Sequence, residues 1–299
     1  MATEPAAADV ARARRTQTRL AAAMVVGSIT SVQCGAALAT TLFDEVGSSG
    51  AVLLRSGFGA LVLLALAGRG LPPVRQWLER DVLLFALALA GATLCFYAAI
   101  ERLPLGVAVT FEFLGPLGVA VFGSRRRRDL IWVALAATGI VLLSNGGSGG
   151  GLDALGVALA VIAAGFWALY ILQSARVGEI HPGMGGLAAA AIVSTAMVAP
   201  IGVADGGVDL LAPAVLAVGL GVGLLSAAIP YALELEALRR LPSAVFGVLM
   251  SLEPAAGAIV GFVALSQGLS LVEVIAIGLV VTASAGALRS AGTLVPRDG

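Results

Sequence analysis

Two stretches of this sequence match each other: LPLGVAVTFEFLGPLGVAVFG at 103–123 and LPSAVFGVLMSLEPAAGAIVG at 241–261. Both contain two prolines twelve residues apart and end on a glycine, with a constant offset of 138 residues between the copies. A chance match of short apolar strings is the alternative, but the repeated proline spacing disfavours it. The sequence therefore predicts an internal repeat with one copy of this stretch in each unit.

The composition around these stretches is typical of a membrane protein. Hydrophobic residues make up 59% of the 299 residues and charged residues only 12%, whereas a soluble domain is roughly half apolar and a quarter charged. A membrane-spanning helix needs about 20 mostly apolar residues. This length predicts ten spans, at 20–43, 49–68, 81–100, 104–123, 129–145, 152–174, 184–204, 212–236, 242–265 and 271–290.

The repeat divides the ten spans into two sets of five. We expect a cytoplasmic tail without regular structure at 1–19, a first five-helix unit at 20–145, a glycine-rich joint at 146–151, a second unit at 152–290 and a second tail at 291–299. Because five is odd, the second unit inserts upside down relative to the first. Inverted repeats are typical of alternating-access transporters that bind their solute near the membrane midplane. The expected fold is therefore an all-α membrane protein with ten transmembrane helices in two inverted five-helix repeats.

The arginines predict the orientation. With the N-terminus in the cytoplasm, sixteen arginines fall on the inner side, only Arg102 falls outside, and Arg55 lies within a helix. This bias matches the positive-inside rule, so we expect both termini in the cytoplasm. The run Arg125–Arg128 could contact nucleic acid, but a topology anchor explains it without such a partner, and none is expected.

Two glutamates are expected near the middle of the bilayer. Glu112 is eight residues into its span and Glu253 eleven residues into its own, which places them about 12 and 16 Å deep in a core of about 30 Å. In the frame of the repeat they are three positions apart, so they share a helix face. We expect both to face a central cavity as substrate-binding or proton-coupling groups. A structural carboxyl group that caps a helix end is the alternative for each.

Two prolines lie beside these glutamates. Pro116 has no N–H for the carbonyl of Glu112, and Pro254 has none for the carbonyl of Met250. We therefore predict a helix kink at both prolines, because free backbone at membrane depth is tolerated where it lines a cavity.

Three further polar side chains are candidates for the same site. Arg55 either binds a substrate carboxylate or a glutamate, or extends its side chain outward to the interface. Gln33 is an isolated amide in the first span and needs a partner there. Glu234 is a candidate too, although a salt-bridge cluster of Glu234 and Glu236 with the nearby arginines 239 and 240 is favoured.

The candidate aromatic residues are those that can offer a hydrogen bond or a ring face to a solute: Tyr97, Trp167, Tyr170 and Tyr231. Aromatic residues near helix ends more often anchor a helix at the interface. Trp167 and Tyr170 are mid-helix and three residues apart, which favours a position in the cavity.

No motif of an enzyme accompanies these residues. The chain has no P-loop, no zinc-protease motif and no Ser/His/Asp set, and its one histidine is His181. Cys34 and Cys95 form no metal-binding pattern. We therefore expect no enzyme activity, no cofactor and no metal.

The sequence resembles the EamA type of the drug/metabolite transporter superfamily, in particular its bacterial exporters of threonine and homoserine. The strings that carry the resemblance are QCGAALAT (33–40), LPLGVAVTFEFLGPLGVAVFGSRR (103–126), WALYIL (167–172) and IPYALELEALRRLPSAVFGVLMSLEPAAG (229–257). The matching residues among the candidates are Gln33, Glu112, Pro116, Trp167, Tyr170, Tyr231, Glu234 and Glu253. Many members carry Gly-Glu where this chain has Ser266-Gln267, so the role of that glutamate in the loop is expected to be lost.

This resemblance implies a carrier in the bacterial plasma (inner) membrane that exports a small amino acid in exchange for protons. The expected partners are an amino-acid solute, protons and the lipid bilayer, and the oligomeric state stays open. A carrier for an aromatic amino acid, a nucleotide sugar or a lipophilic cation is the alternative within the family. A membrane scaffold or enzyme is the alternative of another class, which the repeat and the missing catalytic set disfavour.

Overall fold

The computed structural model describes residues 4–123, 130–145, 152–181, 183–241 and 243–292, and within these ranges its regular elements are all helical. The all-α class is confirmed. The elements are α1 (Glu4–Thr40), α2 (Phe43–Ala67), η1 (Gly68–Gly70), η2 (Val74–Leu78), α3 (Arg80–Ile100), α4 (Leu105–Glu112), α5 (Leu114–Gly123), α6 (Leu130–Asn145), α7 (Ala154–Ile180), α8 (Gly185–Gly206), η4 (Gly207–Leu211), α9 (Pro213–Gly223), η5 (Leu224–Ala228), α10 (Ile229–Leu238), α11 (Ser243–Met250), α12 (Glu253–Leu265) and α13 (Leu271–Gly292). The predicted anchor Arg125–Arg128 and the joint at 146–151 lie outside the described residues.

Eight helices of the described ranges are long and apolar enough to cross a membrane, judged by length and composition. They are Arg19–Thr40, Phe43–Gly70, Arg80–Ile100, Leu105–Phe122, Ala154–Ile180, Gly185–Leu211, Pro213–Glu234 and Val245–Leu265. Two shorter apolar helices, Leu130–Leu143 and Leu271–Ala287, coincide with the remaining two predicted spans. The chain is therefore a multi-pass membrane protein.

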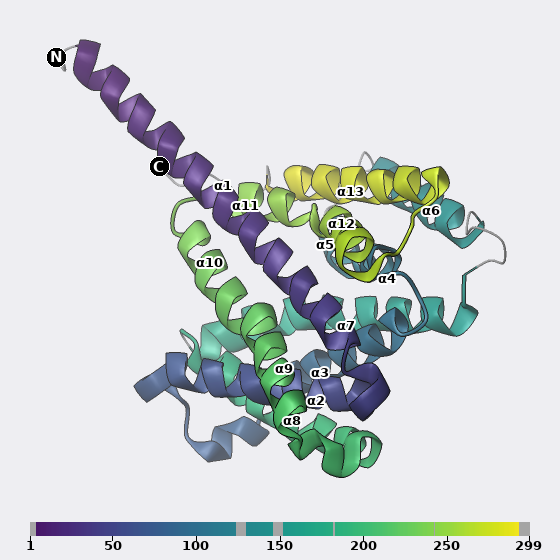
Figure 1. Ribbon diagram of the computed structural model, residues 1–299. Coiled ribbons are helices and arrows are strands. Elements are labelled where there is room, and N and C mark those ends of the chain that lie inside the picture. The colour runs from purple at the N-terminus through teal and green to yellow at the C-terminus, as the bar shows by residue number, and fades with distance from the viewer. Residues whose placement is uncertain (1–3, 124–129, 146–151, 182, 242, 293–299) are drawn as a thin grey trace.

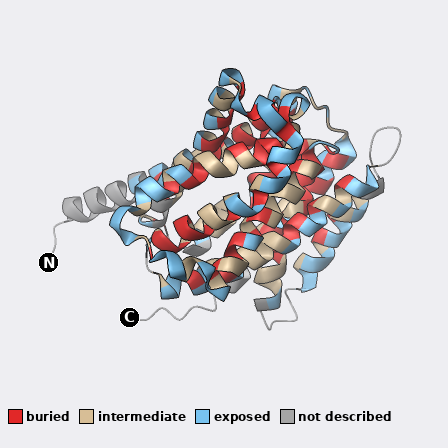
Figure 2. Ribbon diagram, turned by 90° about the horizontal axis from the view of Figure 1, so that it is seen from below, coloured by how far each residue is buried: buried red, intermediate tan, exposed pale blue. Residues whose placement is uncertain are grey.

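The outer surface of the bundle is suited to lipid. Large apolar side chains such as Leu61, Phe122 and Val263 are exposed by 60%, 92% and 74%. Figure 2 shows exposed positions on the outer faces of the helices and buried positions where helices meet. Water would not solvate so much apolar surface, whereas acyl chains do.

The helices pack in pairs that bring distant parts of the chain together. The most extensive pairs include α2 with α8, α3 with α7, α6 with α13, α1 with α10, and α4 with α12 (Figure 1). The last pair is in close contact at Gly106, where a Cβ atom would lie 2.5 Å from the Cα of Ala258. This contact holds the two matching stretches of the sequence against each other.

The buried apolar core is unevenly distributed. Its two largest clusters lie near the α1–α2 and α3–α4 connections and include Leu42, Val52, Leu105 and Phe111. Three smaller clusters lie near the opposite helix ends, each between only two or three elements. The bundle is therefore packed more continuously at one end than at the other.

The start of α1 differs from the prediction. The helix begins at Glu4 and continues to Thr40, so residues 4–19 are helical where a tail without regular structure was expected. Ala and Arg make up most of this segment, and both are strong helix formers. Figure 1 shows this part of α1 extending beyond the other helices.

The predicted turn between the first two spans is also largely helical, because α2 begins at Phe43 rather than near 49. Val46 is fully buried, and Phe43 packs against Tyr97 with ring centroids 6.1 Å apart, so this turn belongs to the core. Gly47 alone leaves the helical conformation, at φ 69°. The Asp205 carboxylate occupies the space that a Cβ at Gly47 would fill and accepts a hydrogen bond from the Ser49 hydroxyl.

The two spans with matching sequences are each broken in the middle. The first divides into α4 and α5 at Phe113, and the second divides into α11 and α12 at 251–252. Pro116 lies in the first turn of α5 and Pro254 in the first turn of α12. Backbone hydrogen bonds continue through both interruptions, from the Phe113 N–H to the Val109 carbonyl and from the Ala256 N–H to the Leu252 carbonyl, so each helix is locally disturbed just before its proline rather than ended.

The segment Ser266-Gln267 corrects one expectation. Ser266 ends α12 at φ 55° and ψ 29°, a left-handed conformation that glycine adopts without strain. The Gln267 side chain accepts a hydrogen bond of 2.9 Å from the backbone N–H of Leu105, the first residue of α4. The amide of Gln267 therefore links the end of α12 to the start of α4, so this position still has a structural contact in the loop.

Candidate functional site

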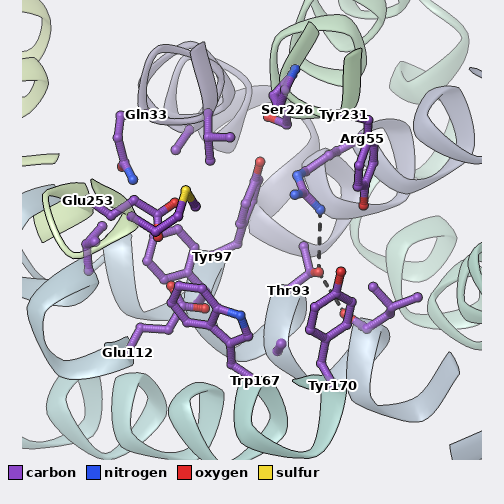
Figure 3. Close-up of a pocket in the computed structure, with 18 of the residues that line it drawn as sticks. Gln33, Arg55, Thr93, Tyr97, Glu112, Trp167, Tyr170, Ser226, Tyr231 and Glu253 are labelled. Carbon is purple, nitrogen blue, oxygen red and sulfur yellow. Dashed lines mark hydrogen bonds between the residues drawn. The ribbon is translucent and has the colours of Figure 1, made fainter. Parts of the chain in front are cut away.

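A cavity of about 300 Å³ lies in the centre of the bundle. Its walls come from α1, α2, α3, α4, α7, α10 and the ends of α11 and α12 at their break. All nine polar and aromatic residues singled out in the sequence line it: Gln33, Arg55, Tyr97, Glu112, Trp167, Tyr170, Tyr231, Glu234 and Glu253. Figure 3 shows most of them around one space, so segments far apart in the sequence form a single candidate site.

The two central glutamates lie at the two helix breaks. Glu112 is the last residue of α4, and Glu253 is the first residue of α12. Glu253 is 6% exposed and its Oε2 atom has no hydrogen-bond partner in the described part of the chain. Glu112 is half-buried and faces the cavity without a hydrogen bond or ion pair to any described residue. The two carboxyl groups, with Glu234, lie close enough for their charges to interact.

Glu234 is separated from the ion pairs that the sequence favoured for it. Its Oε1 accepts a 2.6 Å hydrogen bond from the Ser28 hydroxyl, and its side chain lines the cavity. Glu236 instead pairs with Arg240 at 2.5 Å and with Arg239 at 3.2 Å. The Arg240 guanidinium holds the pKa of the Glu236 carboxyl below its ordinary value. The predicted salt-bridge cluster therefore exists without Glu234, which belongs to the cavity.

Arg55 supplies the positive charge of the cavity. Its guanidinium lies 5.9 Å above the ring of Tyr97, and its Nη1 is 3.5 Å from the Thr93 hydroxyl. No described carboxylate lies within the 4.0 Å of an ion pair, although Arg55 is within electrostatic range of Glu112. The outward-extended alternative is wrong, because the side chain points into the cavity (Figure 3).

The aromatic residues line the cavity between these charges. Trp167 meets Phe113 edge-to-face with centroids 5.2 Å apart, and Tyr170 packs on Phe85 at 5.2 Å. Tyr97 is 2% exposed, and its hydroxyl, which points toward Ser226, has no hydrogen bond of good geometry in the described residues. All three tyrosines of the chain lie at the cavity, so none of them is an interface anchor.

Sequence reasoning missed a turn of π-helix beside the cavity. The element η5 carries Ser226, which lines the cavity, and the Ser31 hydroxyl donates a 2.7 Å hydrogen bond to the carbonyl of Leu225. Gly35 lets α1 approach closely, since a Cβ there would lie 2.3 Å from the Ser226 hydroxyl. Such turns often occur at functional sites, but no residue type in this stretch announces one. Thr93 was also missed, although it is a polar residue within an apolar span and could have been noticed.

The site can bind a small molecule that carries opposite charges. Buried polar atoms normally have partners, yet Gln33 Oε1, Tyr97 OH and Glu253 Oε2 have none among the described residues, and all three belong to cavity-lining side chains. A guanidinium without an acidic partner offers several N–H donors, and the carboxyl groups offer acceptors or protons. Among the described residues, no group of three or more His, Cys, Asp or Glu is placed to hold a metal.

Comparison with known proteins assigns the chain to a family. Residues 154–289 match the EamA-like transporter family. The threonine/homoserine exporter RhtA of Escherichia coli K12 is 39% identical over 264 residues, which cover 87% of this chain and 88% of that protein. The exporter of the same name from Salmonella typhimurium SL1344 is 40% identical over the same shares.

A solved crystal structure also aligns with this chain. It covers 92% of this chain and 99% of its own at a TM-score of 0.56 and 20% identity, which supports the fold alone. With relatives of this identity along most of its length, the protein belongs to the EamA-like transporter family and is a membrane carrier of a small-molecule solute rather than an enzyme.

Proposed function

We propose that this protein exports threonine, homoserine or a similar small amino acid across the bacterial inner membrane, in exchange for protons. The observation that carries the proposal is one cavity in which, among the described residues, Arg55 has no acidic partner within 4.0 Å and two carboxyl groups, Glu112 and Glu253, lie nearby without an ion pair. The names of the two exporters that share about 40% of their residues with this chain support the solute class.

A zwitterion complements the charges of this cavity. The substrate carboxylate would accept hydrogen bonds from Arg55, and Tyr97 is placed to donate another. The substrate ammonium would donate to Glu253 and Glu112. The cavity volume of about 300 Å³ is at the lower end for ligand pockets. This size favours a small amino acid over a nucleotide sugar.

The carboxyl groups provide a route for proton coupling. One guanidinium faces three carboxyl groups, from Glu112, Glu234 and Glu253. A proton and a substrate ammonium would compete for the same carboxylate, so protonation from outside releases the amino acid. Inward movement of one proton supplies about 2.3 kcal/mol per 100 mV of membrane potential. This energy is sufficient to drive export against a concentration gradient.

Ten spans in two inverted repeats are part of the proposal. The helix breaks fall at matching positions, because α4 ends at Glu112 and α11 ends at Met250, which the repeat aligns. The packing pairs also match: exchanging the two units turns the pair α3–α7 into the pair α10–α1. The pairs α2–α8 and α6–α13 are each unchanged by the exchange. These four pairs follow the pattern that a two-fold repeat produces, whereas the pair α4–α12 has no close counterpart in α5–α11.

The orientation is also proposed, with both termini in the cytoplasm, as the arginines indicate. The two large core clusters then cover the outer end of the cavity, where Phe96 and Tyr97 belong both to its lining and to this packing. At the inner end α5 and α11 are barely in contact, although α4 and α12 pack closely. These features support an inward-facing state that receives solute from the cytoplasm.

One observation favours a second candidate, an aromatic amino acid. All three tyrosines, Trp167 and Phe96 line the cavity, and aromatic rings pack well against one another. A phenyl side chain in a cavity of this volume would need movement of the lining residues. The efflux assay that tests the proposal therefore includes phenylalanine.

The test is efflux from proteoliposomes loaded with labelled threonine, homoserine or phenylalanine, with and without a pH gradient. We expect threonine and homoserine efflux to accelerate when the opposite compartment is acidified, while protein-free vesicles stay slow. Gradient-independent threonine efflux would remove the proton from the proposal. Efflux of phenylalanine without efflux of threonine or homoserine would indicate an aromatic amino acid as the substrate instead. The orientation is checked with a cysteine introduced at each end of the chain and a thiol reagent added from one side of the membrane. Labelling of only one end would contradict the proposal that both termini lie on the same side.

A further inference from the structure

Gln33 has an unusual position in the cavity. It is 3% exposed, and its Oε1 has no hydrogen-bond partner among the described residues. The other cavity-lining residues of α1 are apolar, namely Val32 and Ala36. Figure 3 shows the amide on the same side of the cavity as Glu253 and away from Arg55. Most buried polar groups have hydrogen-bond partners, so an unpartnered amide that lines a cavity can receive its partner from a ligand.

The surroundings of Gln33 fix its place and leave a small space beside it. Gly257 lets α12 come close, since a Cβ there would lie 3.3 Å from the Gln33 Oε1 and 3.1 Å from a methyl group of Val109. Val109, Ala36 and Met250 line the cavity at this end. This side of the cavity therefore combines the neutral amide and the Glu253 carboxyl group with apolar walls, which suits a short side chain that has one polar atom.

The charged groups of a zwitterion are better matched elsewhere in the cavity. An ionised partner makes the stronger hydrogen bond with a charged group. The ammonium is therefore drawn to the carboxyl groups and the carboxylate to Arg55. An amide both accepts and donates hydrogen bonds, as a hydroxyl does. The remaining polar group of threonine or homoserine, its side-chain hydroxyl, is the one that matches Gln33.

We propose that Gln33 is the specificity-determining residue that hydrogen-bonds the side-chain hydroxyl of the transported amino acid. This inference rests on the proposed function and adds to it the reason why hydroxy amino acids are selected. Valine has the shape of threonine without the hydroxyl, and norvaline stands in the same relation to homoserine. Either analogue leaves the buried amide without a partner, so each should bind on the order of tenfold more weakly or worse.

The experiment compares two matched variants by competition. Gln33→Met replaces the amide with an apolar side chain of similar length. Gln173→Met is the control, because Gln173 is 6% exposed and has an equally unpartnered Oε1, yet does not line the cavity. The readout is exchange of labelled threonine in proteoliposomes, inhibited by unlabelled threonine, valine, homoserine and norvaline. The measured quantity is the ratio of half-inhibitory concentrations within each isosteric pair.

We expect a ratio of at least about tenfold for the wild type and for Gln173→Met, and a ratio near one for Gln33→Met. If Gln33→Met weakens both members of each pair equally, Gln33 has a structural or proton-transfer role and the inference is overturned. A wild type that does not separate threonine from valine overturns it too, whether or not the variant folds. Gln33→Asn, which withdraws the amide by one methylene, should give an intermediate ratio, and an unchanged ratio speaks against the inference. Absence of threonine exchange in the wild type would instead contradict the proposed function.

Discussion

Replacing Arg55 by methionine should selectively weaken the binding of amino acids that carry a free carboxylate. In the structure the guanidinium has one long hydrogen bond, 3.5 Å to Thr93, and its stacking on Tyr97 at 5.9 Å is worth only about 1 kcal/mol. Most of its five N–H donors therefore remain for the ligand. A charge-assisted hydrogen bond contributes about 1.5–3 kcal/mol. We take about 3 kcal/mol for the carboxylate contact as a whole, which is a rise in Kd of roughly 100-fold.

The assay is calorimetric titration of purified protein with threonine and with threonine amide, which lacks the carboxylate. Arg55→Met should lose most of the threonine affinity but little of its weaker affinity for the amide. Arg176→Met is the control, because Arg176 is 69% exposed and pairs with Asp81 outside the cavity. A threonine Kd within about threefold of the wild type would refute the assignment of the carboxylate to Arg55. Equal losses for threonine and its amide would indicate instead that the cavity has collapsed.

Three further substitutions, one of them with a matched control, test the coupling and the packing. Glu112→Gln should abolish the stimulation of threonine efflux by a pH gradient while the protein still folds, and efflux that keeps its gradient dependence would exclude Glu112 from the coupling. Gly106→Ala should lower the thermal unfolding temperature in detergent, since its Cβ would lie 2.5 Å from the backbone of α12 and overpacking costs about 1–3 kcal/mol. Gly118→Ala is the control, because a Cβ at Gly118 has no heavy atom within 4 Å, and it should leave the unfolding temperature unchanged or raise it. Equal changes in unfolding temperature for the two variants would contradict the close contact between α4 and α12 at Gly106. Ser266→Gly should raise the unfolding temperature, because the left-handed backbone at φ 55° costs a non-glycine residue about 1 kcal/mol and glycine avoids this cost. An unchanged unfolding temperature would show that the conformation of Ser266 does not lower the stability.

The composition of the site was predictable because charge inside a membrane is rare. Arg55, Glu112 and Glu253 are conspicuous in apolar spans, and helix rise alone put both glutamates near mid-membrane. Their convergence on one cavity depends on the packing of the helices, which the spacing of these residues in the sequence does not contain. Glu234 was assigned to the wrong neighbours because two glutamates and two arginines lie within the seven positions 234–240. The sequence alone does not show which glutamate pairs with the arginines. Only the direction of each side chain from α10 separates Glu234 from the ion pairs of Glu236.

Local backbone geometry was the part that could not be predicted. A proline indicates a disturbed helix, but not whether the helix bends or stops, which depends on packing at Phe113 and at 251–252. The π-helical turn at η5 is stabilised by Ser31 of α1, a contact 194 residues away in sequence. The early start of α2 likewise depends on Phe43 meeting Tyr97. Each of these features arises from tertiary contacts that no local pattern contains.

A continuous helix across a membrane acts as a lever: tilting one end inward swings the other end outward about a pivot. The interruptions at Phe113 and at 251–252 weaken this rigid link in the two central spans. The pair α4–α12 can then stay closed at one face while α5 and α11 separate or approach at the other. A conformational change that couples the two faces must therefore pass through these two helix interruptions, where Glu112 and Glu253 lie. In the proposed mechanism, the solute and the proton would therefore bind where the two central helices can bend.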